Sequence, residues 1–91
     1  MSSIPTKFKF KDYEKAIAKV ASEKLLTIEK ENKSGSARRY EVFESDQNGK
    51  PKLKGFWVVH EDKQIYTRDM RKCLPVLGIT EEKLISILEK I

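Results

Sequence analysis

The chain is poor in the residues that build catalytic and metal centres. Its 91 residues include one cysteine, Cys73, and one histidine, His60. A single thiol cannot form an intramolecular disulfide, and a reducing, intracellular setting fits such a chain. A zinc site built from thiols and imidazoles needs more ligands than these two side chains supply. We therefore expect no disulfide scaffold, no metal centre and no cofactor.

Long apolar stretches are also missing. No segment approaches the roughly 20 consecutive apolar residues that cross a bilayer. The first ten residues, MSSIPTKFKF, lack the continuous apolar stretch of a signal peptide. The sequence thus predicts a soluble, cytoplasmic protein without a membrane partner.

Signatures of enzymes are scarce. Gly49 and Gly55 flank a lysine-rich turn, but their spacing is not that of a phosphate-binding loop. His60 and Cys73 could form a catalytic dyad, although His60 falls in an expected strand and Cys73 in a short amphipathic helix. The alternative is a partly buried histidine and a core-facing thiol, which we favour. We expect a protein that is not an enzyme.

Charge is what the chain has in abundance. Charged residues make up 36% of it and the formal net charge is +5. Positions 1–60 carry 13 basic and 8 acidic residues, whereas positions 61–91 carry 6 of each. The excess favours a polyanionic partner, and the length favours one small basic domain over 1–91 with a loose N-terminus at 1–6.

Periodicity predicts the secondary structure. A helix is expected over about 12–24, capped by Asp12, and residues 25–30 read equally as more helix or as a strand. Residues 38–45 form a strand with Tyr40 and Val42 on one face, and a turn at Asn48-Gly49 leads to a second strand at 53–60. A tight turn near 61–63 returns the chain to a strand at 64–67.

The C-terminal third is again helical. Thr67 is expected to cap a short helix at 68–74, Pro75 and Gly78 to interrupt it, and Thr80 to cap a helix at 81–91. The predicted fold class is α+β. It has an N-terminal helix, a three- or four-stranded antiparallel meander, and a C-terminal helix pair packed on one sheet face.

Basic residues recur at a spacing of two. Lys7, Lys9 and Lys11 would share a face of an extended segment, as would Lys50, Lys52 and Lys54. Arg38 and Arg39 open the first firm strand. Phosphate backbones bind such arrangements through charge neutralisation and counterion release. The alternative is that these residues keep a small, edge-rich sheet soluble.

The aromatic residues suggest a stacking surface. If Asp62 and Lys63 form a two-residue hairpin loop, one side of the sheet carries Phe56, Val58 and Ile65, which suits the core. The other side then presents an open aromatic and basic surface, as in proteins that stack single-stranded nucleic acid; it comprises Trp57, Tyr66 and Arg68. The competing interpretation makes Trp57 the anchor of the core.

The tail offers a family comparison. LGIT at 77–80, followed by an amphipathic helix, resembles the turn of a helix-turn-helix and the hairpin of a helix-hairpin-helix motif, both DNA-binding. Pro75 and the acidic pair Glu81-Glu82 depart from the first, and Thr80 replaces a glycine of the second. The order of helix, strands and helix is similar to the double-stranded-RNA-binding fold, without its basic helix N-terminus. We assign no family.

The expected function is a small non-enzymatic nucleic-acid-binding protein of prokaryotic, archaeal or viral type. It would contact mainly phosphates, with weak sequence preference and with DNA favoured over RNA. The alternative is an accessory or regulatory subunit that docks on a larger protein, or on a second copy, through the apolar face of 81–91 at Ile87 and Ile91. That face also fits a wide core-facing stripe.

Overall fold

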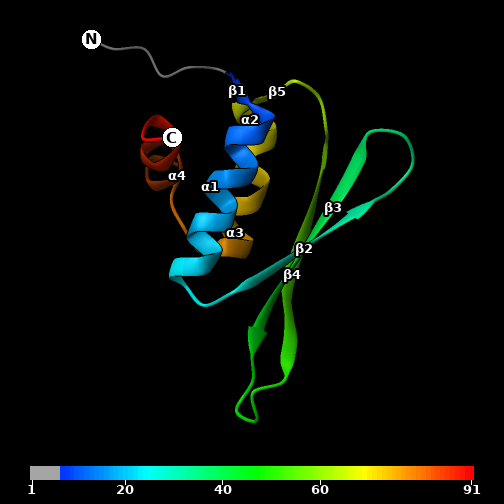
Figure 1. Cartoon of the computed structure of the whole chain (residues 1–91), viewed down its shortest axis with the longest axis vertical. Helices are drawn as coiled ribbons and strands as arrows, with labels where there is room; N and C mark the ends of the chain where they lie inside the picture. Colours follow the sequence, from blue (N-terminus) through cyan, green and yellow to red (C-terminus); the bar gives the residue numbers. More distant parts are fainter. Residues whose placement is uncertain (1–6) are drawn as a thin grey trace.

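The computed structural model describes residues 7–91, which form two small antiparallel sheets and several helices (Figure 1). The predicted loose end at 1–6 lies outside them. The α+β class is confirmed, with an N-terminal helix, a three-stranded antiparallel sheet and C-terminal helices. In chain order the elements are β1 (Lys7–Lys9), α1 (Phe10–Glu23), β2 (Thr27–Asn32), β3 (Ala37–Ser45), β4 (Pro51–His60), β5 (Gln64–Tyr66), α2 (Thr67–Met70), a 3-10 turn η1 (Arg71–Cys73), α3 (Leu74–Leu77) and α4 (Glu81–Glu89).

Helix α1 starts earlier than the sequence predicts, because β1 runs straight into it. Lys9 is the extended N-cap residue and offers no side-chain cap. Asp12 therefore lies in the first turn and is not the cap. The backbone N–H of Phe10 donates to the carbonyl of Lys63 at 3.0 Å, which ties the start of the helix to the chain before β5. Phe10 is also buried, so apolar packing fixes this end of the helix.

The ambiguity at 25–30 resolves as a strand. The chain leaves α1 through Lys24 and through Leu25, whose φ of +60° is the left-handed conformation that ends helices. It then enters β2, which pairs with β3. The three-stranded sheet has the order β2-β3-β4. The ambiguous segment at 25–30, which the sequence left as an optional fourth strand, therefore joins this sheet from Thr27 onward.

The last predicted strand does not join that sheet, which corrects the expected meander. β5 pairs with β1 in a separate two-stranded sheet, called here the β1–β5 ribbon. No two-residue hairpin forms at Asp62-Lys63, because β4 ends at His60 and the N–H of Glu61 donates to the Ser36 carbonyl at 2.7 Å. The chain thereby turns away from β4 before β5 begins.

The face of β4 that enters the core is also the opposite of the predicted one. Trp57 pairs with Tyr40, and these two residues, with Val42 and Val59, are buried. Phe56 and its neighbour Val58 point away from the core and are exposed. The prediction was wrong because it placed β5 beside β4; the actual partner β3 carries its buried residues in register with Trp57.

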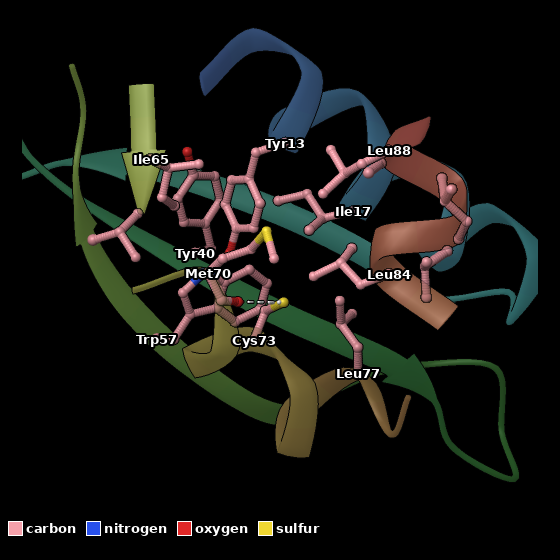
Figure 2. Packing of buried hydrophobic residues seen from close by; sticks show 14 of the residues in the cluster. Tyr13, Ile17, Tyr40, Trp57, Ile65, Met70, Cys73, Leu77, Leu84 and Leu88 are labelled. Atoms are coloured by element: carbon pink, nitrogen blue, oxygen red, sulfur yellow. Dashed lines mark hydrogen bonds between the residues drawn. The ribbon is translucent and has the colours of Figure 1, made fainter. Parts of the chain in front are cut away.

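The core is one cluster that joins helices and sheet (Figure 2). Tyr40 stacks on Trp57 with ring centroids 5.3 Å apart and planes 15° from parallel. Tyr13 and Ile17 of α1 and Cys73 of η1 belong to the same buried cluster as this pair. The interpretation of Trp57 as a core anchor is therefore confirmed, and its place in an open stacking surface is excluded.

The C-terminal segment is helical as predicted, but its boundaries differ. Pro75 does not interrupt the first helical stretch; it lies in the first turn of α3, where its missing N–H costs no hydrogen bond, and α4 ends at Glu89. Thr67 is the first residue of α2 and not its cap. Gly78, with φ +69°, ends α3, and the Thr80 hydroxyl accepts the Lys83 N–H at 3.1 Å, which confirms the predicted cap of α4. α4 packs against α1, while η1 and α3 contact β4. The packing of the C-terminal pair on one sheet face stays a prediction.

The apolar face of α4 is buried in the core of the molecule. Ile87 is 5% exposed and belongs to the core cluster, whereas Ile91 beyond the helix end is 48% exposed. The predicted partner contact at Ile87 is therefore wrong for the folded chain. The wide stripe packs inward because a short protein needs most of its apolar residues in one core. Across residues 7–91, no helix combines the length and apolarity that crossing a membrane requires.

Candidate nucleic-acid interface

The β1–β5 ribbon brings together residues that are far apart in sequence. Its antiparallel register pairs Lys7 with Tyr66, Phe8 with Ile65, and Lys9 with Gln64. Because directly paired residues share a face, four polar or aromatic side chains point one way and the two apolar ones point toward the core. The outward side, called here the ribbon face, consists of Lys7, Lys9, Gln64 and Tyr66.

Tyr66 is the exposed aromatic of this face. It is 57% exposed, while its neighbour Ile65 is buried in the core. Lys7 and Lys9 are exposed and make no ion pair within the described chain. Arg68 is exposed in the first turn of α2, two residues after Tyr66. An aromatic ring beside unpaired cations can stack on a base while the cations neutralise phosphates.

A cleft adjoins the ribbon face at the start of α1. Its volume is about 740 Å³. Lys11 does not extend the strand as predicted; it lies in the first turn of α1 and enters the cleft wall, where Lys63 joins it from the chain before β5. The cleft is lined by Lys9, Phe10, Lys11, Glu14, Lys30, Glu61, Asp62, Lys63 and Gln64.

Some charged side chains of the cleft are paired with each other, and others have no ion-pair partner among the described residues. Lys30 bridges Glu14 at 2.8 Å and Glu61 at 2.7 Å, and the Tyr40 hydroxyl donates to Glu14 at 3.0 Å. The hydrogen bond to Glu14, and then that to Glu61, raises the pKa of Lys30. Lys30 in turn lowers the pKa of Glu61. These carboxylates are thus largely neutralised, which leaves three lysines of the wall free for an anion: Lys9, Lys11 and Lys63.

The two strand arginines are engaged within the protein. Arg38 donates to two backbone carbonyls and to Glu61 at 3.5 Å. Arg39 donates to Glu41 at 3.4 Å, and its guanidinium lies 3.8 Å from the ring centroid of Phe56. The strand fold therefore gives both arginines structural partners, and they lie outside the ribbon face.

The remaining lysine group lies at the other end of the molecule. Lys50, Lys52 and Lys54 surround the turn of the β3–β4 hairpin, which extends away from the helices, whereas the β1–β5 ribbon lies at the opposite end of the long axis (Figure 1). They do not share one face by simple alternation. Gly55 pairs with Val42 and Leu53 with Phe43, so a bulge leaves Lys54 without a paired residue.

The two residues of the predicted catalytic dyad lie in different environments. Burial raises the pKa of the Cys73 thiol to about 11, and this thiol donates to the Met70 carbonyl at 3.2 Å. His60 is exposed at the end of β4, where Ser36 Oγ lies 3.3 Å from its Nδ1. The predicted partly buried histidine is therefore wrong, whereas the core-facing thiol is confirmed. Residues 7–91 contain no cluster of three or more acidic, histidine or cysteine side chains arranged to hold a metal ion.

Trp57 and Tyr13 carry unpaired polar atoms within this core. The indole Nε1 and the Tyr13 hydroxyl are buried without a hydrogen-bond partner among the described residues. Desolvation by burial raises the pKa of the Tyr13 hydroxyl far above its ordinary value. Both rings are therefore structural, and the Trp57 ring cannot reach a base.

The sequence predicted Lys7 and Lys9 as part of one basic face and Tyr66 as part of a separate aromatic surface, but it did not predict that they meet. Sequence reasoning missed Lys63 and Gln64, because it placed Lys63 in a hairpin loop next to β4. The signal that was available is the alternation of Gln64, Ile65 and Tyr66, which matches that of Lys7, Phe8 and Lys9.

Comparison with known proteins gives no guide to this site. No family model, curated protein or solved structure matches the chain.

Proposed function

We propose that this protein is a small, basic nucleic-acid-binding protein and that a single-stranded segment binds across the ribbon face. The observation that carries the proposal is the pairing of Lys7 with Tyr66, which sets an exposed aromatic ring beside unpaired cations. A base stacks on the Tyr66 ring, and the flanking phosphates contact Lys7 and Lys9. These contacts are made to phosphates and to the face of a base, so we expect a weak sequence preference.

The adjoining cleft extends the path of the strand. Lys11 and Lys63 line it and offer charge to the next phosphates, and the Gln64 amide can hydrogen-bond a base edge. The strand must be single because a base can stack on a side chain only when it is splayed out of a duplex. DNA is the ligand expected from the sequence, and no contact of the ribbon face discriminates it from RNA.

The lysines of the β3–β4 hairpin act at longer range. They add to the net charge of +5 and thereby speed the approach of a polyanion, but they lie too far from Tyr66 to share its site. The proposal therefore separates a localised binding site at the ribbon face from general electrostatic attraction by the hairpin lysines.

The test compares two charge reversals of equal size. Lys7→Glu/Lys9→Glu and Lys50→Glu/Lys52→Glu each lower the net charge by the same amount, at opposite ends of the molecule. Fluorescence anisotropy of a labelled oligothymidylate should show a loss of about tenfold or more for the first pair and a smaller loss for the second. Equal losses would mean that net charge alone drives binding, and a larger loss for the second pair would move the site to the hairpin.

A further inference from the structure

The three-stranded sheet has a second side, opposite the one that carries its buried residues. Side chains on that side alternate with the buried Tyr40, Val42, Trp57 and Val59. We call it the outer sheet face; it includes Glu29, Glu31, Arg39, Glu41, Phe43, Leu53, Phe56 and Val58.

An apolar row runs along β4 on this face. Leu53 is 46% exposed, Phe56 49% and Val58 37%. Phe43, half-buried, lies across from Leu53 and widens the row toward β3. Three large apolar side chains aligned on one strand are costly to leave in water, and such rows mark interaction sites.

An acidic row runs beside it. Glu29 of β2 lies directly across from Glu41 of β3, and like charges in that position destabilise a sheet. Arg39 pairs with Glu41, and Lys33 in the turn after β2 pairs with Glu31 at 2.8 Å. Glu29 has no ion pair within residues 7–91. One negative charge is thus left uncompensated at the centre of this row, in a chain whose net charge is +5.

The two rows fit one kind of ligand. β2 and β4 are the outer strands of the sheet, so Glu29 lies two strand spacings, about 10 Å, from the apolar row. That is the width of one α-helix with its side chains. Glu41 lies between Glu29 and this row on β3 and is paired with Arg39, whose guanidinium lies 3.8 Å from the Phe56 ring centroid. We propose that the outer sheet face docks an amphipathic helix of a partner protein, with its apolar stripe over Leu53, Phe56 and Val58 and with a lysine or arginine residue over Glu29.

A second copy of this chain fits the face less well. If two copies stacked with their β4 rows in contact about a two-fold axis perpendicular to the strands, the acidic rows would face each other as well. If the axis ran along the strands, either each apolar row would face an acidic row, or, with the axis over β4, the apolar rows would meet and the acidic rows would stay in water. None of these arrangements gives Glu29 a basic partner. Nucleic acid is also disfavoured there, because its phosphates would meet the unpaired carboxylate of Glu29.

The probe for this proposal is a pair of synthetic helical peptides. Each has about 14 residues, long enough to cover the apolar row, and a leucine stripe flanked on one side by lysines or, in the second peptide, by glutamates. Anisotropy of the labelled peptides should show that the lysine peptide binds about tenfold more tightly. General electrostatic attraction by a chain of charge +5 would favour the glutamate peptide, so this preference cannot come from net charge.

Variants locate the binding. Phe56→Ser should weaken binding of the lysine peptide about tenfold. Leu25→Asn, which removes an exposed leucine outside the outer sheet face, should not weaken it. Glu29→Lys should weaken the lysine peptide more than Glu89→Lys, which changes net charge equally on α4. Lys7→Glu/Lys9→Glu should leave the peptide bound, so the outcome is independent of the nucleic-acid proposal.

Several results would overturn the proposal. These are no binding of the lysine peptide, equal or tighter binding of the glutamate peptide, and equal effects of Glu29→Lys and Glu89→Lys. A dimer in sedimentation that Phe56→Ser dissociates would assign the face to a second copy. If a bound oligonucleotide covered Phe56, the outer sheet face would be assigned to nucleic acid.

Discussion

Lys7 lies directly across from Tyr66 in the β1–β5 ribbon, although 58 residues separate them in the chain. The pairing sets an exposed aromatic ring beside a lysine that has no acidic partner within the described residues. Neither strand is long enough to be stable alone, and the pair of half-buried Phe8 and buried Ile65 beneath the ribbon anchors it to the core. The core thus determines the geometry of the surface above it.

The first prediction concerns the Tyr66 ring. Tyr66→Ser should weaken binding of an oligothymidylate by roughly 1–3 kcal/mol, the contribution of one stacked base, whereas Tyr66→Phe should retain most of the affinity. Anisotropy titrations measure both. If Tyr66→Phe loses as much affinity as Tyr66→Ser, the Tyr66 hydroxyl makes the contact and the ring does not stack on a base.

The second prediction concerns salt. Each phosphate contact to a single strand contributes about 0.7 to the slope of log affinity against log salt. Lys7→Ala/Lys9→Ala should therefore reduce the slope by about 1.4, and Lys50→Ala/Lys52→Ala should change it less. Titrations over a series of salt concentrations give the slopes. A larger change for the hairpin pair would contradict the placement of the site.

The third prediction concerns Trp57. Because it is buried on Tyr40, its fluorescence should be blue-shifted, inaccessible to acrylamide and unchanged by oligonucleotide. Trp57→Ala should cost about 3–5 kcal/mol of unfolding free energy. Trp57→Phe should cost less than Trp57→Ala, because it keeps an aromatic ring against Tyr40 and leaves a smaller cavity. Quenching of Trp57 by acrylamide in the folded protein would contradict this burial.

The fourth prediction concerns acid stability. Pairing with Lys30 lowers the pKa of Glu61 from its usual 4.5, so the folded state binds this proton less readily than the unfolded state. The stabilisation is present above pH 4.5 and is lost as pH falls through the lowered pKa. Glu61→Gln should therefore lose less stability than the natural chain between neutral and acidic pH. Urea unfolding at several pH values tests this, with Glu89→Gln as the control; an identical pH dependence for Glu61→Gln would count against the ion pair.

The same pair acts in the opposite direction at alkaline pH. The pKa of Lys30 is raised from 10.5, so its contribution is full below 10.5 and is lost as pH rises through the raised value. Lys30→Met should therefore flatten the alkaline limb of the stability curve. A limb that stays as steep would exclude Lys30 as a source of that pH dependence.

The fifth prediction concerns the acidic row of the outer sheet face. Glu29→Lys replaces a like-charge pair with an attractive one across from Glu41, and should raise the unfolding free energy by roughly 0.2–1 kcal/mol. Glu89→Lys makes the same change of net charge without a cross-strand partner. Thermal unfolding compares the two variants. Destabilisation by Glu29→Lys would show that Glu29 has a partner that stabilises the folded chain.

The boundaries of several elements could be predicted because their signals are local. The cap at Thr80, the turn at Gly49 and the alternation around Tyr40 and Val42 each depend on neighbouring residues only. The start of α1 at Phe10 was missed because it depends on a hydrogen bond to Lys63, which is remote in sequence.

The faces of β4 could not be predicted from the strand alone. Phe56 with Val58 and Trp57 with Val59 are two apolar sets of similar character, so alternation defines two sides without saying which one is buried. The choice is made by Tyr40 and the rest of the partner strand. The candidate site was hidden for the same reason, since its residues meet only through the non-local pairing of β1 with β5.

The most direct test of the account is to map the oligonucleotide on the backbone amides. Nuclear magnetic resonance spectra of the ¹⁵N-labelled protein, titrated with oligothymidylate, report each residue separately. We expect the largest shifts at Lys7, Lys9, Gln64 and Tyr66, smaller ones at the cleft, and little change at 50–54 or on the outer sheet face. Shifts concentrated in the β3–β4 hairpin, or no shifts at the ribbon face, would contradict the assignment of nucleic-acid binding to that face.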